Sequence, residues 1–187
     1  FDNYNLIHQL TLIIIIAIAI TIISMFSRKN KFNPIIIIGG LMTFSLVIDI
    51  ILDSKLIKYS YLGYCPIIGA RYYGIGNEYL GILLGSSIIF SFCLIERFKV
   101  KRSVICLFFI LISIIIGFPS LGANVGGAIT AAFGYTYLVL RLNKPNIRIK
   151  DYLYIFVSAI LFLIFLSLTD LYFLNRKTHL ANALISI

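Results

Sequence analysis

A set of polar side chains able to do acid–base or binding chemistry falls at one end of the apolar segments of this sequence. They are Asp49, Asp53, Arg71, Asn77, Glu78, Asn124, Asp170 and His179. Charge inside a bilayer costs roughly 2.5–3.5 kcal/mol per residue on insertion scales, so a charged group at that depth needs a reason. A cluster on a single side predicts a site that opens to the outer face of a membrane.

The strongest local pattern is Arg71 followed by GIGNE at residues 74–78. Glycines let the backbone turn sharply or approach a ligand closely. In a functional interpretation Arg71 clamps an anion, Gly74, Gly76 and Asn77 help to bind it, and Glu78 is a base or a cation ligand. The alternative is a buried Arg71–Glu78 pair that ties the loop to the following helix. A dinucleotide site is excluded because no βαβ unit surrounds the glycines.

The second glycine-rich stretch is GANVGG at residues 122–127. A helix that begins near Gly126 would aim its positive end outward, and such an end suits phosphate or carboxylate. Asn124, Gly126 and Gly127 are therefore candidate substrate-binding residues. The alternative is close helix packing through small residues, and we assign Gly81 and Gly85 to packing of that kind.

Carboxylates and a histidine complete the candidate set. Asp49 and Asp53 are four residues apart and would share one face of a helix, where they could hold a divalent metal. Alternatively, Asp53 caps the segment beside Lys55 while Asp49 bonds to a neighbouring helix. Asp170 and His179 could together form a general base, in which the carboxylate orients the imidazole. Alternatively, His179 is a lone interfacial histidine, which is often inert. The catalytic candidates are thus Glu78, Asp170 and His179.

Composition identifies the class of protein. Of the 187 residues, 60% are hydrophobic and 12% are charged, and the mean hydropathy is +1.02. Soluble domains are about half apolar and roughly a quarter charged. The chain is therefore expected to be a single transmembrane domain spanning residues 1–187. Frequent Ile, with Asn and Lys in the loops, is typical of an AT-rich bacterial genome.

The fold class expected is an all-α bundle of six transmembrane helices with glycine-rich irregular loops on the extracytoplasmic side. Because about 20 apolar residues cross a bilayer core, we place the segments near 6–26, 35–52, 76–95, 103–118, 127–141 and 152–173. The segment 103–118 is slightly short. The irregular stretches at 72–81 and 117–127 should meet, because non-helical backbone at membrane depth survives only inside protein or along a watery cavity.

The net charge of +9 reports topology rather than nucleic-acid binding. Most of the 16 Lys and Arg residues lie in alternate loops, at 27–33, 96–102 and 141–151. By the positive-inside rule these loops are cytoplasmic, which puts both termini outside. The N-terminal residues are not a signal peptide. Either the first helix inserts unaided with its N-terminus outside, or the chain is the membrane part of a longer protein in a bacterial cell membrane, and we favour the second.

Three fragments together carry a family resemblance: GARYYGIGNEYLG at 69–81, GFPSLGANVGG at 117–127, and THL at 178–180 after Asp170. They resemble the C-terminal multi-helix membrane region of large bacterial envelope proteins, mostly Gram-positive. In those proteins an extracytoplasmic domain related to alkaline phosphatase or PglZ precedes the helices. The matching positions are Arg71, Gly74, Gly76, Asn77, Glu78, Gly122, Asn124, Gly126, Gly127, Asp170 and His179. This chain has Ala181 where the family has Gly. The resemblance implies a preceding domain but no activity.

The leading hypothesis is therefore a membrane module of cell-envelope processing. It would bind the phosphate headgroup of a membrane lipid or lipid-linked glycan and work with an extracytoplasmic hydrolase- or transferase-like domain of the same or a partner chain. Two other classes stay open. One is a transporter or channel subunit that uses the same polar cluster, and the other is a structural anchor. A transport path needs polar groups across the whole depth, whereas the inner halves offer only Ser, Thr, Tyr and Cys, which favours a one-sided site.

Overall fold

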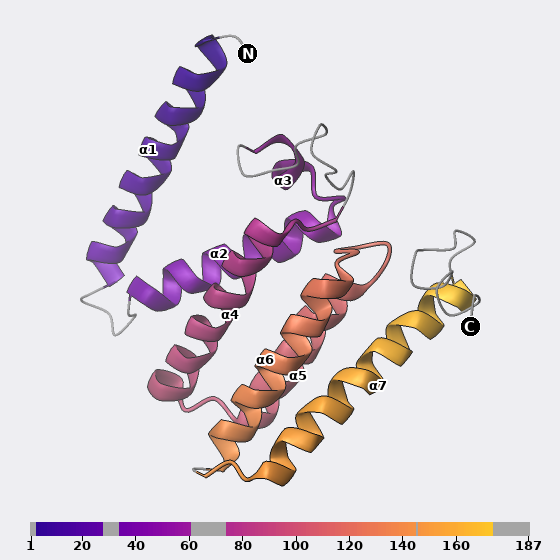
Figure 1. Ribbon diagram of the computed structural model, residues 1–187. Coiled ribbons are helices and arrows are strands. Elements are labelled where there is room, and N and C mark those ends of the chain that lie inside the picture. Colours follow the sequence, from indigo (N-terminus) through magenta and orange to yellow (C-terminus); the bar gives the residue numbers. More distant parts are fainter. Residues whose placement is uncertain (1–2, 28–33, 61–73, 145, 174–187) are drawn as a thin grey trace.

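The computed structural model describes residues 3–27, 34–60, 74–144 and 146–173, and all the regular structure in these ranges is helical (Figure 1). The helices are α1 (Asn3–Ser27), α2 (Pro34–Ile51), α3 (Lys55–Tyr59), α4 (Asn77–Phe98), α5 (Arg102–Gly117), α6 (Val125–Asn143) and α7 (Ile149–Phe173). The long helices coincide with the predicted apolar segments, with ends shifted by a few residues. Only α3 was not anticipated.

Apolar composition and helix length make this a membrane protein of the α-helical class. Four described helices are long and apolar enough to cross a bilayer: α2, α4, α6 and Ile149–Thr169 of α7. Two shorter apolar helices are Ile13–Met25, within α1, and α5. In hydrocarbon every backbone N–H and C=O must be bonded within the protein, and a helix achieves this within a single segment.

The core lies where α2, α4, α5 and α6 meet. Ile50, Leu83, Ile112 and Ile116 are essentially inaccessible there, together with small residues of α6 such as Ala128. Helix α6 packs against both α5 and α7, and α2 packs mainly against α4. Helix α1 stands apart from the other helices in Figure 1 and contacts α2. Its isoleucine side chains are largely exposed.

Glycines bring α2 and α4 close together, although not the glycines that the sequence suggested. A Cβ at Gly39 would lie 3.4 Å from the Phe90 Cβ, and one at Gly40 would lie 3.0 Å from the Phe90 ring. A Cβ at Gly81 or Gly85 would meet nothing within 4 Å in the described chain. The packing role predicted for Gly81 and Gly85 is therefore wrong within the described residues, because α2 approaches a neighbouring face of α4.

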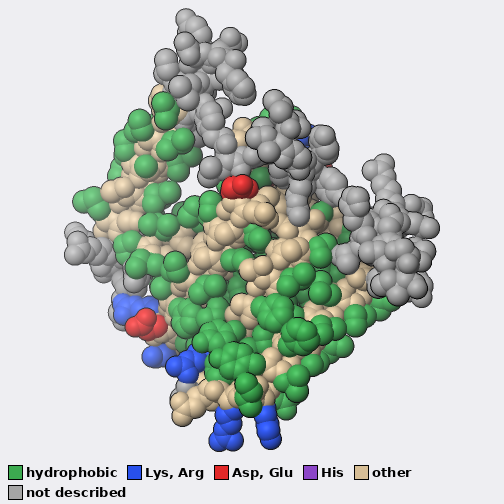
Figure 2. Space-filling view, viewed as in Figure 1, with side chains coloured by type: hydrophobic (Ala, Val, Ile, Leu, Met, Phe, Trp, Pro, Cys, Tyr) green, Lys and Arg blue, Asp and Glu red, His purple; other side chains and the backbone are tan. Residues whose placement is uncertain are grey.

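Basic side chains collect at one end of the helices. In Figure 2 most of the visible Lys and Arg lie at the lower end, and apolar side chains cover much of the face above them. This is the end at which α4 leads into α5 and α6 leads into α7 (Figure 1). The glycine-rich connections before α4 and α6 lie at the opposite end. Most of the Lys and Arg residues that the structure describes thus lie at the end of the bundle opposite the glycine-rich connections.

Candidate functional site

The two glycine-rich stretches are in direct contact at the starts of α4 and α6. The backbone N–H of Ile75 donates to the Gly122 carbonyl oxygen at 2.8 Å. The Asn124 side-chain amide donates to the Ile75 carbonyl oxygen at 3.0 Å. Ile75 is 0% exposed and Asn124 is 1% exposed. The prediction that these irregular stretches meet is confirmed, and buried hydrogen bonds fix the geometry of the junction.

Two glycines make this close approach feasible. Gly74 has φ 80°, and a Cβ there would lie 2.1 Å from the Gly122 carbonyl oxygen. A Cβ at Gly122 would lie 2.4 Å from the Ile116 carbonyl oxygen. Both distances are far below van der Waals contact, so no other residue type fits without moving the backbone. The Gly122 N–H meanwhile donates to Ile115 at 2.9 Å, which folds the loop back onto α5.

Asn124 holds the junction together through both the oxygen and the nitrogen of its side-chain amide. It is the N-cap of α6, where its side-chain oxygen accepts from the Gly127 N–H at 2.8 Å. Its side-chain nitrogen reaches the Ile75 carbonyl oxygen and, at 3.4 Å, the Asn77 side-chain oxygen. One buried side chain therefore caps one helix and ties it to the start of another.

Gly127 also has a packing role. A Cβ at this position would lie 2.8 Å from a Leu80 methyl group, so the absence of a side chain lets α6 approach α4. Asn124 and Gly127, both predicted as substrate-binding residues, thus sit in the supporting layer of the junction. They position the residues on its surface.

The exposed rim of the junction consists of Asn77, Glu78 and Gly126. Gly76, the N-cap of α4, has no side chain with which to accept from the first-turn N–H groups. Asn77 and Glu78 occupy that first turn, where the positive end of the helix dipole favours a carboxylate or another anion. The beginnings of α4 and α6 therefore lie side by side, and Asn77, Glu78 and Gly126 are exposed there.

Asp49 has a different environment from the one that its spacing suggested. Its two carboxylate oxygens accept from the N–H groups of Leu56 and Ile57, each at 2.9 Å, and the residue is 5% exposed. The carboxylate thereby satisfies the first-turn donors of α3 from a neighbouring helix. This resembles the alternative in which Asp49 bonds to a neighbouring element.

The prediction that Asp53 shares a helix face with Asp49 is wrong. Helix α2 ends at Ile51, and Asp53 follows in a left-handed conformation with φ 68°. The chain reverses there so that α3 can pack back on α2, which leaves Asp53 exposed while Asp49 is buried. Among the described residues, no group of three His, Cys, Asp or Glu side chains lies close enough to hold a metal ion. A divalent metal at Asp49 and Asp53 stays an untested prediction.

Three of the predicted site residues fall outside the described side chains. Arg71 and His179 lie outside the described ranges, and Asp170 belongs to α7 with a side chain that is not described. The expected Arg71–Glu78 pair and the expected Asp170–His179 pair accordingly stay predictions.

A buried polar contact in the middle of the bundle was not singled out from the sequence. The hydroxyls of Ser87 on α4 and Tyr135 on α6 lie 2.7 Å apart. The Tyr135 ring stacks on Phe109 of α5, with centroids 4.1 Å apart. The sequence did contain a pattern that places Ser87 in the core, because Leu80, Leu83 and Ser87 recur at helical spacing on the core-facing side of α4. The contact joins three helices below the junction.

No protein-family model, curated protein or solved structure matches this chain significantly. The geometry of the junction and of its surroundings is therefore the basis for a functional proposal.

Proposed function

We propose that the junction of α4 and α6 binds the phosphate headgroup of a lipid or lipid-linked glycan at the outer face of a bacterial cell membrane. The observation that carries the proposal is the start of α4, where the N-cap residue Gly76 has no side chain to cap the first-turn N–H groups. It lies beside the start of α6, with Asn77 and Gly126 on the exposed rim. First-turn N–H groups and the positive end of the helix dipole are the elements with which helix N-termini bind phosphate.

The charge of Glu78 shapes the proposed roles. A carboxylate in the first turn of α4 would repel a phosphate unless a cation offsets it. Arg71, three residues before Gly74, is proposed to supply that cation and to contact the phosphate directly. Glu78 is then free to act as an acid or a base on the bound headgroup, with Asp170 and His179 as further acid–base candidates.

The topology belongs to the same proposal. Six membrane crossings, with both termini and the glycine-rich loops outside, would place the junction at the outer headgroup level. The module would then present a lipid-linked substrate to an extracytoplasmic hydrolase- or transferase-like domain. The gathering of basic side chains at the opposite end of the bundle supports this orientation.

Binding can be tested with farnesyl phosphate, a short prenyl phosphate, and with farnesol, which lacks the phosphate. The full chain in phosphatidylcholine nanodiscs should bind farnesyl phosphate at least about tenfold more tightly than farnesol. Arg71→Gln and Asn77→Ala should each remove most of that preference. Arg97→Gln, a change of an exposed arginine in the last turn of α4 at the opposite end, is the matched control and should leave it intact. Equal binding of the two ligands, or equal effects of both arginine changes, would refute the proposal.

Orientation can be tested by labelling Lys58→Cys, an exposed position in the last turn of α3. The three native cysteines, Cys65, Cys93 and Cys106, are first replaced by Ser. A membrane-impermeant maleimide added to intact cells should label the new thiol. Labelling only after the cells are permeabilised would place the junction on the cytoplasmic side.

A further inference from the structure

The turn between α6 and α7 forms a polar hollow of about 440 Å³, lined by Lys144, Asn146, Arg148 and Asp151. The Lys144 ammonium contacts one Asp151 carboxylate oxygen at 2.6 Å, and the Arg148 backbone N–H donates to the other at 2.9 Å. The Asp151 side chain is 4% exposed, whereas that of Lys144 is 52% exposed. The single carboxylate is thus buried under its partners, and the surface of the hollow presents the exposed Lys144 and Arg148 side chains.

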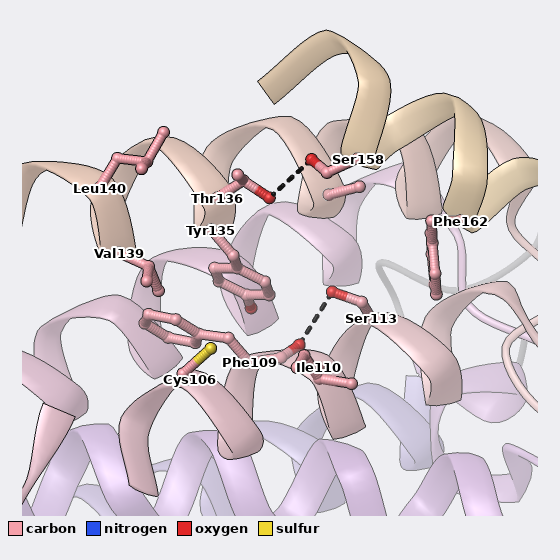
Figure 3. A pocket seen from close by; sticks show the side chains of 11 residues that line it. Cys106, Phe109, Ile110, Ser113, Tyr135, Thr136, Val139, Leu140, Ser158 and Phe162 are labelled. Atoms are coloured by element: carbon pink, nitrogen blue, oxygen red, sulfur yellow. Dashed lines mark hydrogen bonds between the residues drawn. The ribbon is translucent and has the colours of Figure 1, made fainter. Parts of the chain in front are cut away.

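An apolar groove of about 300 Å³ lies between α5, α6 and α7 (Figure 3). Ile110, Val139, Leu140 and Phe162 form much of its lining. It lies where α5 and α7 both pack on α6. A partly open groove of this size suits a hydrocarbon chain, since ligand pockets start at about 300 Å³.

The polar atoms of the groove are already engaged. Ser113 donates to the Phe109 carbonyl oxygen at 2.8 Å, and Ser158 donates to the Ile155 carbonyl oxygen at 2.8 Å. The Ser158 and Thr136 hydroxyls lie 3.3 Å apart (Figure 3). An occupant therefore needs no hydrogen-bonding groups of its own, which favours an aliphatic chain over a polar ligand.

The groove and the hollow follow the same α6–α7 seam. On α6, the Lys144 N–H donates to the Leu140 carbonyl oxygen, so the cation lies one turn beyond the groove lining. On α7, Asp151, Ser158 and Phe162 recur at helical spacing on one face. A molecule that follows this seam meets two exposed basic side chains, Lys144, which is paired with Asp151, and Arg148, and then the apolar groove.

We propose that this seam binds an anionic phospholipid from the leaflet at the basic end of the bundle. The phosphate lies against Lys144 and Arg148, and one acyl chain occupies the groove between α5, α6 and α7. Charge complementarity selects the headgroup, because basic pockets between membrane helices attract anionic lipids. The position of the hollow and the groove one after the other along the α6–α7 seam favours a lipid over a soluble anion. The proposal is independent of the function proposed for the α4–α6 junction, which lies at the other end of α6.

Delipidated full-length protein in detergent can be titrated with dioleoyl phosphatidylglycerol and dioleoyl phosphatidylcholine, with bound lipid counted by native mass spectrometry. Phosphatidylglycerol should bind at least about fivefold more tightly. Arg148→Gln should remove most of this preference, and it leaves the Lys144–Asp151 pair in place. Lys101→Gln, an exposed lysine change at the same end before α5, should change it less than twofold. Equal affinity for the two lipids, or equal effects of the two substitutions, would overturn the headgroup assignment.

The groove is tested separately with Ala132→Phe, which fills it, and with glycerol 3-phosphate, the headgroup without chains. Ala132→Phe should weaken phosphatidylglycerol binding at least about fivefold while the variant keeps the helical circular dichroism of the wild type. Glycerol 3-phosphate should fail to compete at equal concentration. The competition needs only wild-type protein, so it tests whether the acyl chain contributes to binding even if Ala132→Phe does not fold. Full competition by glycerol 3-phosphate would show binding by charge alone and overturn the groove.

Discussion

The two ends of α6 are held by different kinds of interaction. At its N-terminal end, neutral groups make short buried hydrogen bonds, and Asn124 with the glycines on either side fixes the backbone. At its C-terminal end, the charged side chains of Lys144 and Arg148 are exposed around a single buried carboxylate. Steric fit determines the backbone geometry at the N-terminal end, whereas exposed charge distinguishes the surface at the C-terminal end.

This difference predicts different responses to change. Where a Cβ would collide with backbone atoms, no flexible side chain can move aside. Even a small substitution at the junction should therefore strongly lower the stability of the fold. Exposed charges are solvated and screened by salt, so single charge changes should barely affect folding while altering affinity for charged ligands. Substitutions at the two ends therefore separate effects on stability from effects on binding.

The largest effect is expected from Gly122→Ala. The new methyl group would lie 2.4 Å from the Ile116 carbonyl oxygen, so the loop must shift and lose its hydrogen bonds to α5 and to Ile75. We expect a loss of roughly 3 kcal/mol or more in the free energy of unfolding. The measurement is the thermal midpoint of detergent-solubilised protein, followed by fluorescence of a thiol-reactive dye.

Gly81→Ala is the matched control, because a Cβ at Gly81 meets nothing within 4 Å in the described chain. Alanine is favoured over glycine inside a helix by about 1 kcal/mol. We expect this variant to melt at the wild-type temperature or slightly above it. If both glycine changes destabilise the protein equally, the steric account of the junction fails.

Periodicity and composition were sufficient to predict the long helices and the meeting of the two loops. Asn124 was found by its residue type, but its role was not predictable. Whether an amide faces a ligand or a backbone carbonyl depends on the exact approach of α4 to α6. Asp53 was misplaced for a similar reason. The chain reverses directly after Ile51, with left-handed backbone at Asp53 and Ser54, and this reversal, which brings α3 back to Asp49, was not predicted.

The next largest effect is expected from Asn124→Ala. This change removes the cap on the Gly127 N–H and leaves the buried Ile75 carbonyl oxygen without its side-chain donor. A lost cap costs about 1 kcal/mol, and the loss of a buried hydrogen bond costs about 1–1.5 kcal/mol. A combined loss of about 2–3 kcal/mol should appear in the same melting assay. Asn124→Asp keeps the cap acceptor but not the donor, so it should not restore wild-type stability. Full restoration by Asp would show that the contact with Ile75 contributes nothing.

A smaller effect is expected from Asp49→Asn. The amide can accept with only one of its two polar atoms, so one of the N–H groups of Leu56 and Ile57 loses its partner. We expect a loss of about 1–2 kcal/mol. Asp53→Asn should leave the stability unchanged, because Asp53 is exposed and asparagine tolerates a left-handed backbone.

A chelator such as EDTA should leave the wild-type melting temperature unchanged. A fall of several degrees, reversed by Mg²⁺ or Ca²⁺, would instead support a metal shared by the two aspartates.

The smallest effect on stability is expected from Glu78→Gln. Glu78 is exposed in the first turn of α4, so the change removes mainly a favourable interaction with the helix dipole, worth about 0.5 kcal/mol. If Glu78 acts on a bound headgroup, turnover of a lipid-linked phosphate substrate should be lost while the protein melts almost normally. If Glu78 is instead the partner of a buried Arg71, the single change leaves a cation unpaired, at a cost on the order of 3–5 kcal/mol.

The double variant Arg71→Gln with Glu78→Gln distinguishes these two cases, because it removes both charges together. In a purely structural pair, each single variant is unstable, and the double variant recovers both stability and function. In a binding site, the single Glu78→Gln variant is already stable. The double variant then stays folded but inactive, and it also loses affinity for farnesyl phosphate because the proposed phosphate ligand Arg71 is gone. Recovery of function in the double variant would remove both residues from the proposed site. Stability without function would leave the exposed rim of α4 as the part of the junction that acts on the ligand.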